Sequence, residues 1–374
     1  MPRALLGIAA LACLASGGAW AGAAGADCPV LRSSGSPSSP VPRLAAPAER
    51  SALDVYFVDV EGGQATLFVA ASGESMLVDA GFPGYDDRDA KRIAAAAADA
   101  GVTRIDYLIV THYHRDHVGG VPALAARLPV GVFVDHGASV EQGADAAALY
   151  QAYLETRAKG RHLQVAPGDP IPVAGLDVRV VASGGELLAA PPAGDAARNP
   201  HCENASPREA DPSENARSVG IVVRHGRFRL LNLGDLTWNK ELELACPENR
   251  IGRVDVYLTT HHGLASSGPP ALVRAVEPRA AVMNNGARKG GAPEAWRIVR
   301  DAPRLEDLWQ LHRSEAGGDD HNVPEAFIAN PDETTAHWIK LSARPDGSFV
   351  VTNGRTGLSK HYAARADAPH AAAP

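Results

Sequence analysis

Short apolar runs separated by glycine, proline and polar residues dominate the chain from residue 53 onward. Runs that are continuously apolar, or in which apolar and polar residues alternate, predict β-strands. The predicted strands are 53–60, 65–69, 75–79, 107–110, 130–135, 218–223, 228–233, 254–258, 280–283, 336–343 and 348–352. The last two are expected to form a hairpin around the Pro-Asp-Gly turn at 345–347.

Helical sequence lies between these strands. An alanine-rich segment at 89–100 is followed by Gly101, which is typical of a helix and its C-terminal cap. Further helices are predicted at 121–128, 271–276 and 293–300. Because strands and helices intermingle without a second block of distinct composition, we predict one α/β domain over residues 51–362.

The first 21 residues have the pattern of an export signal. Arg3 precedes an apolar core at 5–14, and 19–21 form a small-x-small cleavage site. The core is short for a bilayer span, so a membrane anchor is the less favoured alternative, and no later run approaches ~20 apolar residues. We therefore expect a periplasmic or secreted protein without a membrane span.

Two further segments are predicted to lie outside the folded domain. Residues 22–50 are rich in Ala, Ser, Pro and Gly, which is typical of a flexible N-terminus. Residues 363–374 are expected to form a disordered tail. A long loop or insertion is predicted at 184–212, of the kind that often borders a site.

The cysteines allow at most one internal disulfide. Cleavage of the signal removes Cys13 and leaves Cys28, Cys202 and Cys246, an odd number. Cys202 and Cys246 both lie in loop sequence, on either side of the strand pair at 218–233. We predict a disulfide between these two, with free cysteines as the alternative.

The composition and net charge of the chain bear on which partners it could bind. The hydrophobic content of 45% is enough for a sizeable core, and the formal net charge is −7 without a long basic run. Proteins that bind long nucleic acids usually present a basic face. Long nucleic acid is therefore not favoured, and the sequence leaves the oligomeric state open.

A dense cluster of histidines follows the predicted strand at 107–110. His112, His114, Asp116 and His117 fall within six residues, and the run ends in a glycine pair. Alternate side chains of an extended segment share a face, so His112 and His114 are expected to point the same way. Imidazole nitrogen and carboxylate oxygen suit zinc, manganese or iron. We therefore predict a divalent metal site at this strand end.

Three more predicted strands end in residues of the same kind. Asp79 follows one strand, Asp235 follows another, and His261 and His262 follow a third. Each is weak evidence alone, because an aspartate after a strand is often a turn former. Their shared placement indicates that the side chains converge on one edge of a sheet sandwich and enclose a metal.

The order of these motifs resembles that of a known family. Asp-Ala-Gly, His-x-His-x-Asp-His, Gly-Asp and Thr-His-His-Gly, spread over residues 58–263, resemble the metallo-β-lactamase fold. Segments 58–65 and 261–263 are most similar to its ComEC-like competence-protein branch. The resemblance implies a four-layer αββα sandwich with one or two divalent ions, zinc most favoured and manganese the alternative.

The resemblance also implies six metal ligands, grouped by ion. The first ion is expected to bind His112 and His114, the second Asp116, His117 and His261, and Asp235 is expected to bridge the two. Asp116 and Asp235 would thereby act in catalysis.

Several accessory roles follow from the same resemblance. Asp79 would orient a ligand histidine from behind, as outer carboxylates commonly do. His262 would donate a proton in catalysis, support a ligand, or simply pack. Many family members carry a further histidine upstream of the bridging aspartate, which this chain lacks. Asn215 and Ser218 match the polar pair of the ComEC-like branch in that region, and His201 is another substitute. The first metal site is therefore expected to be weaker or more metal-selective.

This constellation indicates hydrolysis. A divalent ion lowers the pKa of bound water and holds hydroxide as the nucleophile, so no serine or cysteine nucleophile is needed. By analogy with the branch, the leading hypothesis is an exported metal-dependent hydrolase of phosphodiesters, acting on a small-molecule or short anionic substrate. The loop around Arg288 and Lys289 could meet that anion, although a solvated loop is the favoured interpretation.

Two other functions are alternatives to this hypothesis. One is a lactonase or β-lactamase-type hydrolase of cyclic esters or amides. The other is a non-catalytic metal-binding component of a DNA-uptake system. DNA translocation by this chain itself is not expected, because the sequence lacks a transmembrane channel.

Overall fold

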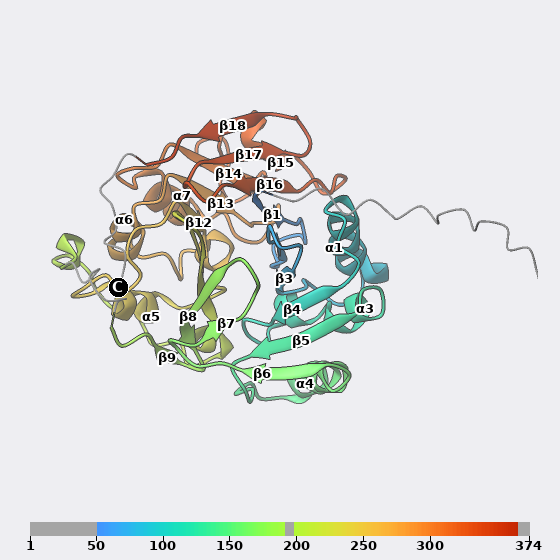
Figure 1. The fold of residues 1–374 in the computed structure, drawn as a ribbon. Coiled ribbons are helices and arrows are strands. Elements are labelled where there is room, and N and C mark those ends of the chain that lie inside the picture. The colour runs from blue at the N-terminus through green and yellow to red at the C-terminus, as the bar shows by residue number, and fades with distance from the viewer. Residues whose placement is uncertain (1–50, 191–197, 366–374) are drawn as a thin grey trace, which may run out of the picture. The chain divides into compact units, whose positions relative to one another are not determined.

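Two β-sheets face each other, and helices cover the outer side of each sheet (Figure 1). The computed structural model describes residues 51–190 and 198–365, all within one unit of the chain. The expected four-layer αββα architecture is confirmed. The predicted export signal at 1–21, the N-terminus at 22–50, Cys28 and residues 366–374 lie outside the described residues.

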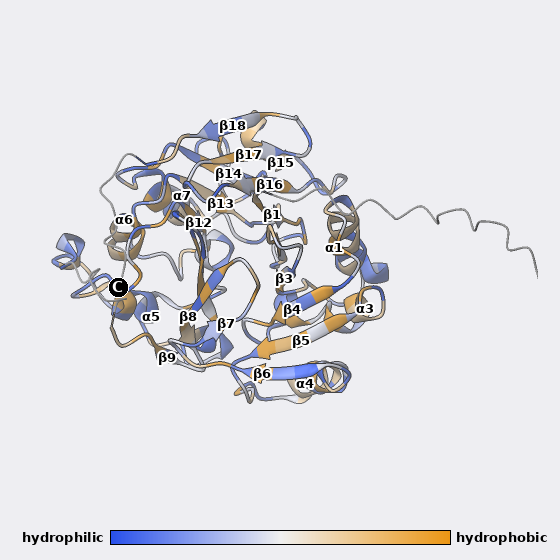
Figure 2. Ribbon diagram, viewed as in Figure 1, coloured by the Kyte–Doolittle hydropathy of each residue, from blue (hydrophilic) through white to orange (hydrophobic). Residues whose placement is uncertain are grey.

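The first sheet is mixed. Its strands, in spatial order, are β18 (Ser359–Tyr362), β17 (Phe349–Asn353), β16 (Ile339–Ala343), β1 (Leu53–Phe57), β2 (Thr66–Val69), β3 (Ser75–Val78), β4 (Ile105–Ile109), β5 (Val130–Asp135) and β6 (Arg161–Gln164). Pairing is antiparallel from β18 to β3 and parallel from β3 to β6. The edge strand β6 is hydrophilic (Figure 2), which disfavours pairing with another chain.

The second sheet is also mixed. Its strands are, in spatial order, β15 (Ile328–Asn330), β14 (Asp307–His312), β13 (Ala280–Met283), β12 (Val256–Leu258), β11 (Phe228–Asn232), β10 (Gly220–His225), β8 (Asp177–Ser183) and β7 (Pro170–Ile171), while β9 (Glu186–Leu187) pairs with β8. Strands β11 to β15 run parallel, and the remaining pairs are antiparallel.

The helices segregate by sheet. The α-helices are α1 (Arg88–Asp99), α2 (Arg115–Val118), α3 (Val121–Ala125), α4 (Ala144–Arg157), α5 (Trp238–Ala245), α6 (Pro270–Val276) and α7 (Pro293–Arg300). The 3-10 turns are η1 (Tyr85–Asp87), η2 (Pro200–Cys202), η3 (Glu214–Arg217), η4 (Thr260–Gly263) and η5 (Glu325–Phe327). Residues of α1, α3 and α4 pack on the first sheet, and those of α5, α6 and α7 pack on the second.

The central core lies between the two sheets. Phe57, Val78 and Ile109 of the first sheet share one cluster with Leu230 and Trp309 of the second, and all five are essentially inaccessible to solvent. Each fully buried side chain of this size contributes roughly 1.5–3 kcal/mol of transfer free energy. The strand ends that carry polar residues are therefore fixed by a rigid apolar layer beneath them.

Some elements differ from the sequence-based expectation. No element was predicted in 136–183, which contains α4, β6, β7 and β8, or in 301–335, which contains β14 and β15. Helix α4 is rich in alanine and buries few side chains, so its apolar stripe is weak. The strand expected at 336–343 begins only at Ile339. Among the described residues, no helix is long and apolar enough to cross a membrane.

The predicted insertion is tied to the body of the domain. Cys202 in η2 and Cys246 at the end of α5 form a disulfide, with their Cα atoms 5.8 Å apart. Arg198 forms an isolated β-bridge with Glu248. At the other end of the domain, Arg365 lies within the residues assigned to the tail, and its Nε is 3.0 Å from Asp255. The insertion is therefore attached to the C-terminal end of α5.

Candidate metal site

Polar side chains gather where four strands end. Asp79 directly follows β3, and His112 to His117 follow β4. Asp235 follows β11, and η4, which carries His261 and His262, follows β12. Strands β3 and β4 are parallel neighbours, as are β11 and β12, so each pair delivers its residues to one edge. The convergence expected from the sequence is present in the structure.

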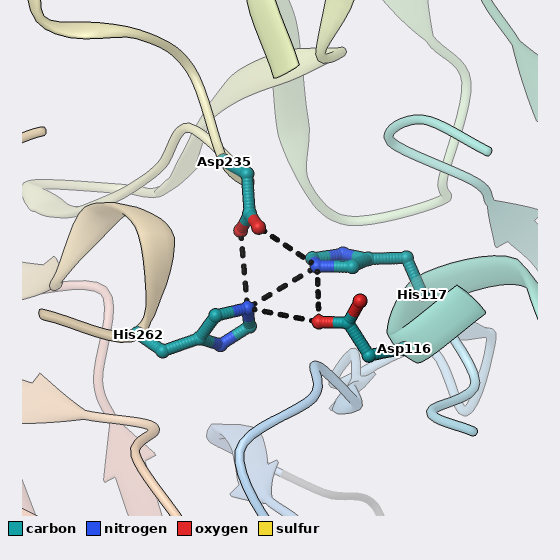
Figure 3. Close-up of side chains that lie close together, drawn as sticks. All are labelled: Asp116, His117, Asp235 and His262. Carbon is teal, nitrogen blue, oxygen red and sulfur yellow. Dashed lines mark hydrogen bonds and ion pairs between the residues drawn. The ribbon is translucent and has the colours of Figure 1, made fainter. Parts of the chain in front are cut away.

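Four of these residues form a compact cluster (Figure 3). Asp116, His117, Asp235 and His262 are all buried, and one ligand atom of each lies within 4.8 Å of the others. His117 Nε2 is 3.2 Å from His262 Nε2, 3.2 Å from Asp116 Oδ2 and 3.1 Å from Asp235 Oδ2. His262 Nε2 is 3.3 Å from both carboxylates.

This donor set fits a divalent metal. Zinc bonds of about 2.1 Å in a tetrahedral site place neighbouring ligand atoms about 3.4 Å apart. The observed separations of 3.1–3.3 Å come close to that spacing. Two imidazole nitrogens that face each other in a dry environment need a proton or a metal between them. The cluster is therefore consistent with the divalent metal binding that is typical of such His and Asp groups.

Electrostatics at the cluster favour a bound cation. Burial opposes charge on His117, but the carboxylates of Asp235, Asp116 and Asp79 outweigh it and raise the pKa of His117 well above its usual range. Burial likewise opposes charge on Asp235 and Asp116, yet the neighbouring imidazoles, that of His117 first, keep the pKa of each carboxyl well below its usual range. A metal ion would satisfy the same negative charge that otherwise retains a proton on His117.

Asp79 lies behind His117, as expected for an orienting carboxylate. Its Oδ2 is 2.7 Å from His117 Nδ1 and accepts a hydrogen bond from the Thr111 hydroxyl at 2.7 Å. The Thr111 amide donates to the other oxygen at 2.8 Å. With Nδ1 bound to Asp79, His117 presents Nε2 to the cluster. Thr111 was not identified from the sequence.

His112 and His114 form the other half of the site. His112 Nε2 lies 3.0 Å from His114 Nδ1 and 4.0 Å from Asp235 Oδ2. His112 is fully buried, and burial, with the nearby His117, lowers its pKa well below the usual range. The His114 side chain is 31% exposed. These two histidines adjoin the cluster but are not among its four members.

The two adjacent histidines of η4 differ in placement. His262 belongs to the cluster, whereas the sequence assigned the ligand role to His261 and an accessory role to His262. His261 Nε2 is 3.3 Å from Asp235 Oδ2, and its Nδ1 is 3.0 Å from the Ser266 hydroxyl. Burial lowers the pKa of His261 to about 4. Both histidines have a left-handed backbone, with φ of 55° and 56°, and their ring centroids lie 6.0 Å apart.

The loop at 288–291 lies against this turn. The Gly291 amide donates to the His262 carbonyl at 3.0 Å, and a Cβ added to Gly290 would lie 2.2 Å from that oxygen. Only glycine permits this approach. The loop thereby brings the Lys289 ammonium into contact with Asp116 Oδ2, while Arg288 is exposed and pairs with Glu315. The solvated loop expected from the sequence therefore holds for Arg288 but not for Lys289, which contacts Asp116.

The accessory residues lie on the side of His112 and His114. Ser218 Oγ accepts a hydrogen bond from the Asp235 amide at 3.3 Å and is 3.5 Å from His112 Nδ1. Asn215 Nδ2 donates to Asp211, and its Oδ1 is buried without a hydrogen-bond partner among the described residues. His201 lies in η2 beside the disulfide.

A pocket of about 290 Å³ borders the site at His261. Its walls come from the insertion, the first turn of α5 and the segment after η4: Arg208, Glu209, Asp211, Thr237, Trp238, Asn239, His261, Ala265 and Ser266. The Arg208 guanidinium stacks 3.5 Å above the Trp238 ring and pairs with Glu294. The insertion therefore forms one wall of the space that reaches the site.

Comparisons with known proteins give partial matches to the chain. Residues 58–197 match the metallo-beta-lactamase superfamily. Over 63 residues the chain is 41% identical to the hydroxyacylglutathione hydrolase of Stenotrophomonas maltophilia. That match covers 17% of this chain and 21% of the relative, so it spans about a fifth of the curated protein.

Solved structures with a similar course of the chain have low sequence identity. The metallo-beta-lactamase fold protein YhfI from Bacillus subtilis has a TM-score of 0.43 at 10% identity, over 69% of this chain and 95% of that one. CmlA, a diiron beta-hydroxylase from Streptomyces venezuelae, has a TM-score of 0.38 at 16% identity, over 70% and 48% of the two chains. With its two mixed sheets the chain has the metallo-beta-lactamase fold, and residues 58–197 carry its match to the metallo-beta-lactamase superfamily.

Proposed function

We propose that the protein is a metal-dependent hydrolase that cleaves phosphodiesters. The observation that carries the hydrolase proposal is the buried cluster of Asp116, His117, Asp235 and His262 at the strand ends. A divalent metal bound there would supply an activated water and a Lewis acid. His112 and His114 would hold a second ion beside it, with Asp235 between the two sites.

The chain's own residues have defined tasks in this proposal. Asp235, whose carboxylate contacts both halves, would accept a hydrogen bond from the attacking water. Asp79 keeps His117 in the orientation that offers Nε2 to the metal. The buried surroundings exclude bulk water, which strengthens every charge interaction in the site.

The position of Lys289 favours an anionic substrate. Its ammonium contacts Asp116 at the edge of the cluster, and its side chain is 33% exposed. Once a metal neutralises Asp116, the lysine would be available to bind a substrate oxyanion. Phosphodiesters carry such an oxyanion beside the scissile bond, and the pocket at His261 would accept the adjoining group.

A panel of substrates tests this proposal. The purified protein is assayed for bound metal and for turnover of bis(p-nitrophenyl) phosphate, a chromogenic lactam and a lactone. We expect phosphodiester turnover that a chelator abolishes. The role of Lys289 is tested by Lys289→Gln, which should lower kcat/KM for the phosphodiester by roughly 10²- to 10³-fold. Arg288→Gln is the matched control, because Arg288 is exposed and pairs away from the cluster. Lactam turnover without phosphodiester turnover would overturn the substrate class.

A carbonyl substrate is the second candidate. The local similarity to a hydroxyacylglutathione hydrolase supports it, since that relative is named for hydrolysis of an acylated glutathione. A carboxylate on a thioester, lactone or lactam would engage Lys289 in the same way. Selective turnover of the lactone or of a thioester in the panel would favour this candidate.

We also infer that the protein is exported. The sequence at 1–21 and the Cys202–Cys246 disulfide support a periplasmic or secreted location, since disulfides persist in oxidising compartments. We further propose kinship with the ComEC-like branch, on the basis of segments 58–65 and 261–263. A DNA-binding assay that detects no affinity at low salt would exclude a role in DNA uptake.

A further inference from the structure

Glu141 occupies the position behind His114 that Asp79 occupies behind His117. Its Oε1 is 3.0 Å from His114 Nε2, whereas His114 Nδ1 faces His112 Nε2 at 3.0 Å. The Glu141 side chain is 27% exposed, so the pair is partly shielded from water. A carboxylate on one ring nitrogen selects the tautomer and leaves the other nitrogen free as a ligand.

Glu141 is itself fixed by η3, which follows the insertion. The same Oε1 accepts a hydrogen bond from the Glu214 amide at 3.1 Å, at the start of η3. One carboxylate oxygen therefore joins His114 to the polypeptide that carries Asn215 and Ser218. Glu141 lies in the loop between β5 and α4, for which the sequence predicted no element.

Glu214 anchors this arrangement from inside the protein. Its side chain is fully buried, and its oxygens accept hydrogen bonds from the Val140 amide at 2.7 Å and the Tyr113 amide at 3.1 Å. His136 Nε2 lies 2.9 Å from Oε2. Burial raises the pKa of Glu214, but the imidazole of His136 and these hydrogen bonds outweigh it and lower the pKa below its ordinary value. The loop, η3 and the histidine motif are therefore locked together.

We propose that Glu141 is a positioning residue that holds His114 ready to bind a metal through Nδ1, and that η3 holds Glu141 in place. The inference rests on the proposed metal site. Since the further histidine of many family members is absent, the carboxylate of Glu141 and the η3 segment would support the first ion instead. His114 then depends on Glu141 in the same way that His117 of the cluster depends on Asp79.

Metal titration of the whole protein tests this role without any substrate. The metal-free protein is titrated with cobalt(II), followed by visible absorption, and with zinc against a chromophoric chelator. Glu141→Ala should weaken one binding step by roughly 10- to 100-fold, the range seen when an outer carboxylate is removed. Glu141→Gln keeps a hydrogen-bond acceptor without the charge and should fall between the alanine variant and the wild type.

A matched control and a stability measurement separate positioning from folding. Glu155→Ala changes an exposed glutamate of α4 that contacts Gln151, so its titration should equal that of the wild type. The metal-free form of Glu141→Ala should unfold at nearly the wild-type temperature. Unchanged metal affinities in Glu141→Ala would overturn the proposal, as would a loss of stability without a loss of affinity. Because no substrate is present, failure of the substrate panel leaves this outcome unaffected.

Discussion

The two halves of the site are built differently. The cluster of Asp116, His117, Asp235 and His262 is buried, and four donors from three strand ends meet within 4.8 Å. On the other side, His112 and His114 face each other without a third histidine, and His114 is about a third exposed. The first arrangement is set by the strand ends of the two sheets, whereas the second relies on the loop that carries Glu141 and on η3. We infer that the halves differ in metal affinity, the cluster being the tighter.

The largest expected effect comes from the residue that both halves share. Asp235 contacts His112, His117, His261 and His262, so Asp235→Ala should disturb both metal positions. We expect a loss of hydrolysis on the order of 10³-fold, above the 10- to 100-fold typical of losing an outer carboxylate. Steady-state assays with metal analysis check it. Asp301→Ala, at an exposed position, is the control and should retain full activity.

A smaller effect concerns the pH dependence of stability, at a buried glutamate near the turn that carries His262. Glu241 of α5 is fully buried, accepts a hydrogen bond from the Gly268 amide, and has its pKa raised to about 8 by burial. In the folded protein this carboxyl stays protonated up to about that pH, whereas the unfolded chain ionises it near 4.5. Its contribution to stability is therefore complete below about 4.5 and is lost as the pH rises to 8.

Glu241→Gln removes this dependence. Relative to the variant, the wild type should lose about 1.4 kcal/mol of unfolding free energy per pH unit across that window. Urea unfolding of both proteins at about pH 5 and about pH 8 measures the difference. Parallel pH profiles for the two proteins would show that Glu241 is ionised in the folded state.

The smallest expected effect lies on the His112 side. Ser218 contributes one hydroxyl, which accepts from the Asp235 amide and lies near His112 Nδ1. A single neutral hydrogen bond is worth about 1 kcal/mol, so Ser218→Ala should weaken metal binding by about fivefold. Isothermal titration with zinc checks this value. A loss as large as that of Asp235→Ala would mean that the serine supports both halves.

Features of the fold and site that depend on periodicity and motif spacing could be predicted from the sequence. Apolar alternation predicted the strands on either side of the core, and strand-end placement predicted that Asp79, His117 and Asp235 would meet. Helix α4 was not predicted from the sequence because its alanines give no strong apolar stripe. An apolar pattern arises only where an element buries one of its faces. Elements that bury few side chains therefore cannot be predicted from it.

Contacts between distant loops have no such signal in a single sequence. Glu141 and Glu214 are separated by 73 positions and meet only because η3 packs on the loop after β5. The choice between His261 and His262 depends on two left-handed backbone angles, which spacing does not encode. Lys289 reaches Asp116 across 173 positions, through a glycine-dependent approach of its loop.

The difference between the two halves is tested most directly by zinc titration of three proteins: the wild type, His262→Ala and His114→Ala. We expect the wild type to bind one ion more tightly than any other. His114→Ala should retain that tight ion, whereas His262→Ala should lose it. Loss of the tight ion in His114→Ala together with its retention in His262→Ala would contradict the account, because the tight position would then lie at His112 and His114.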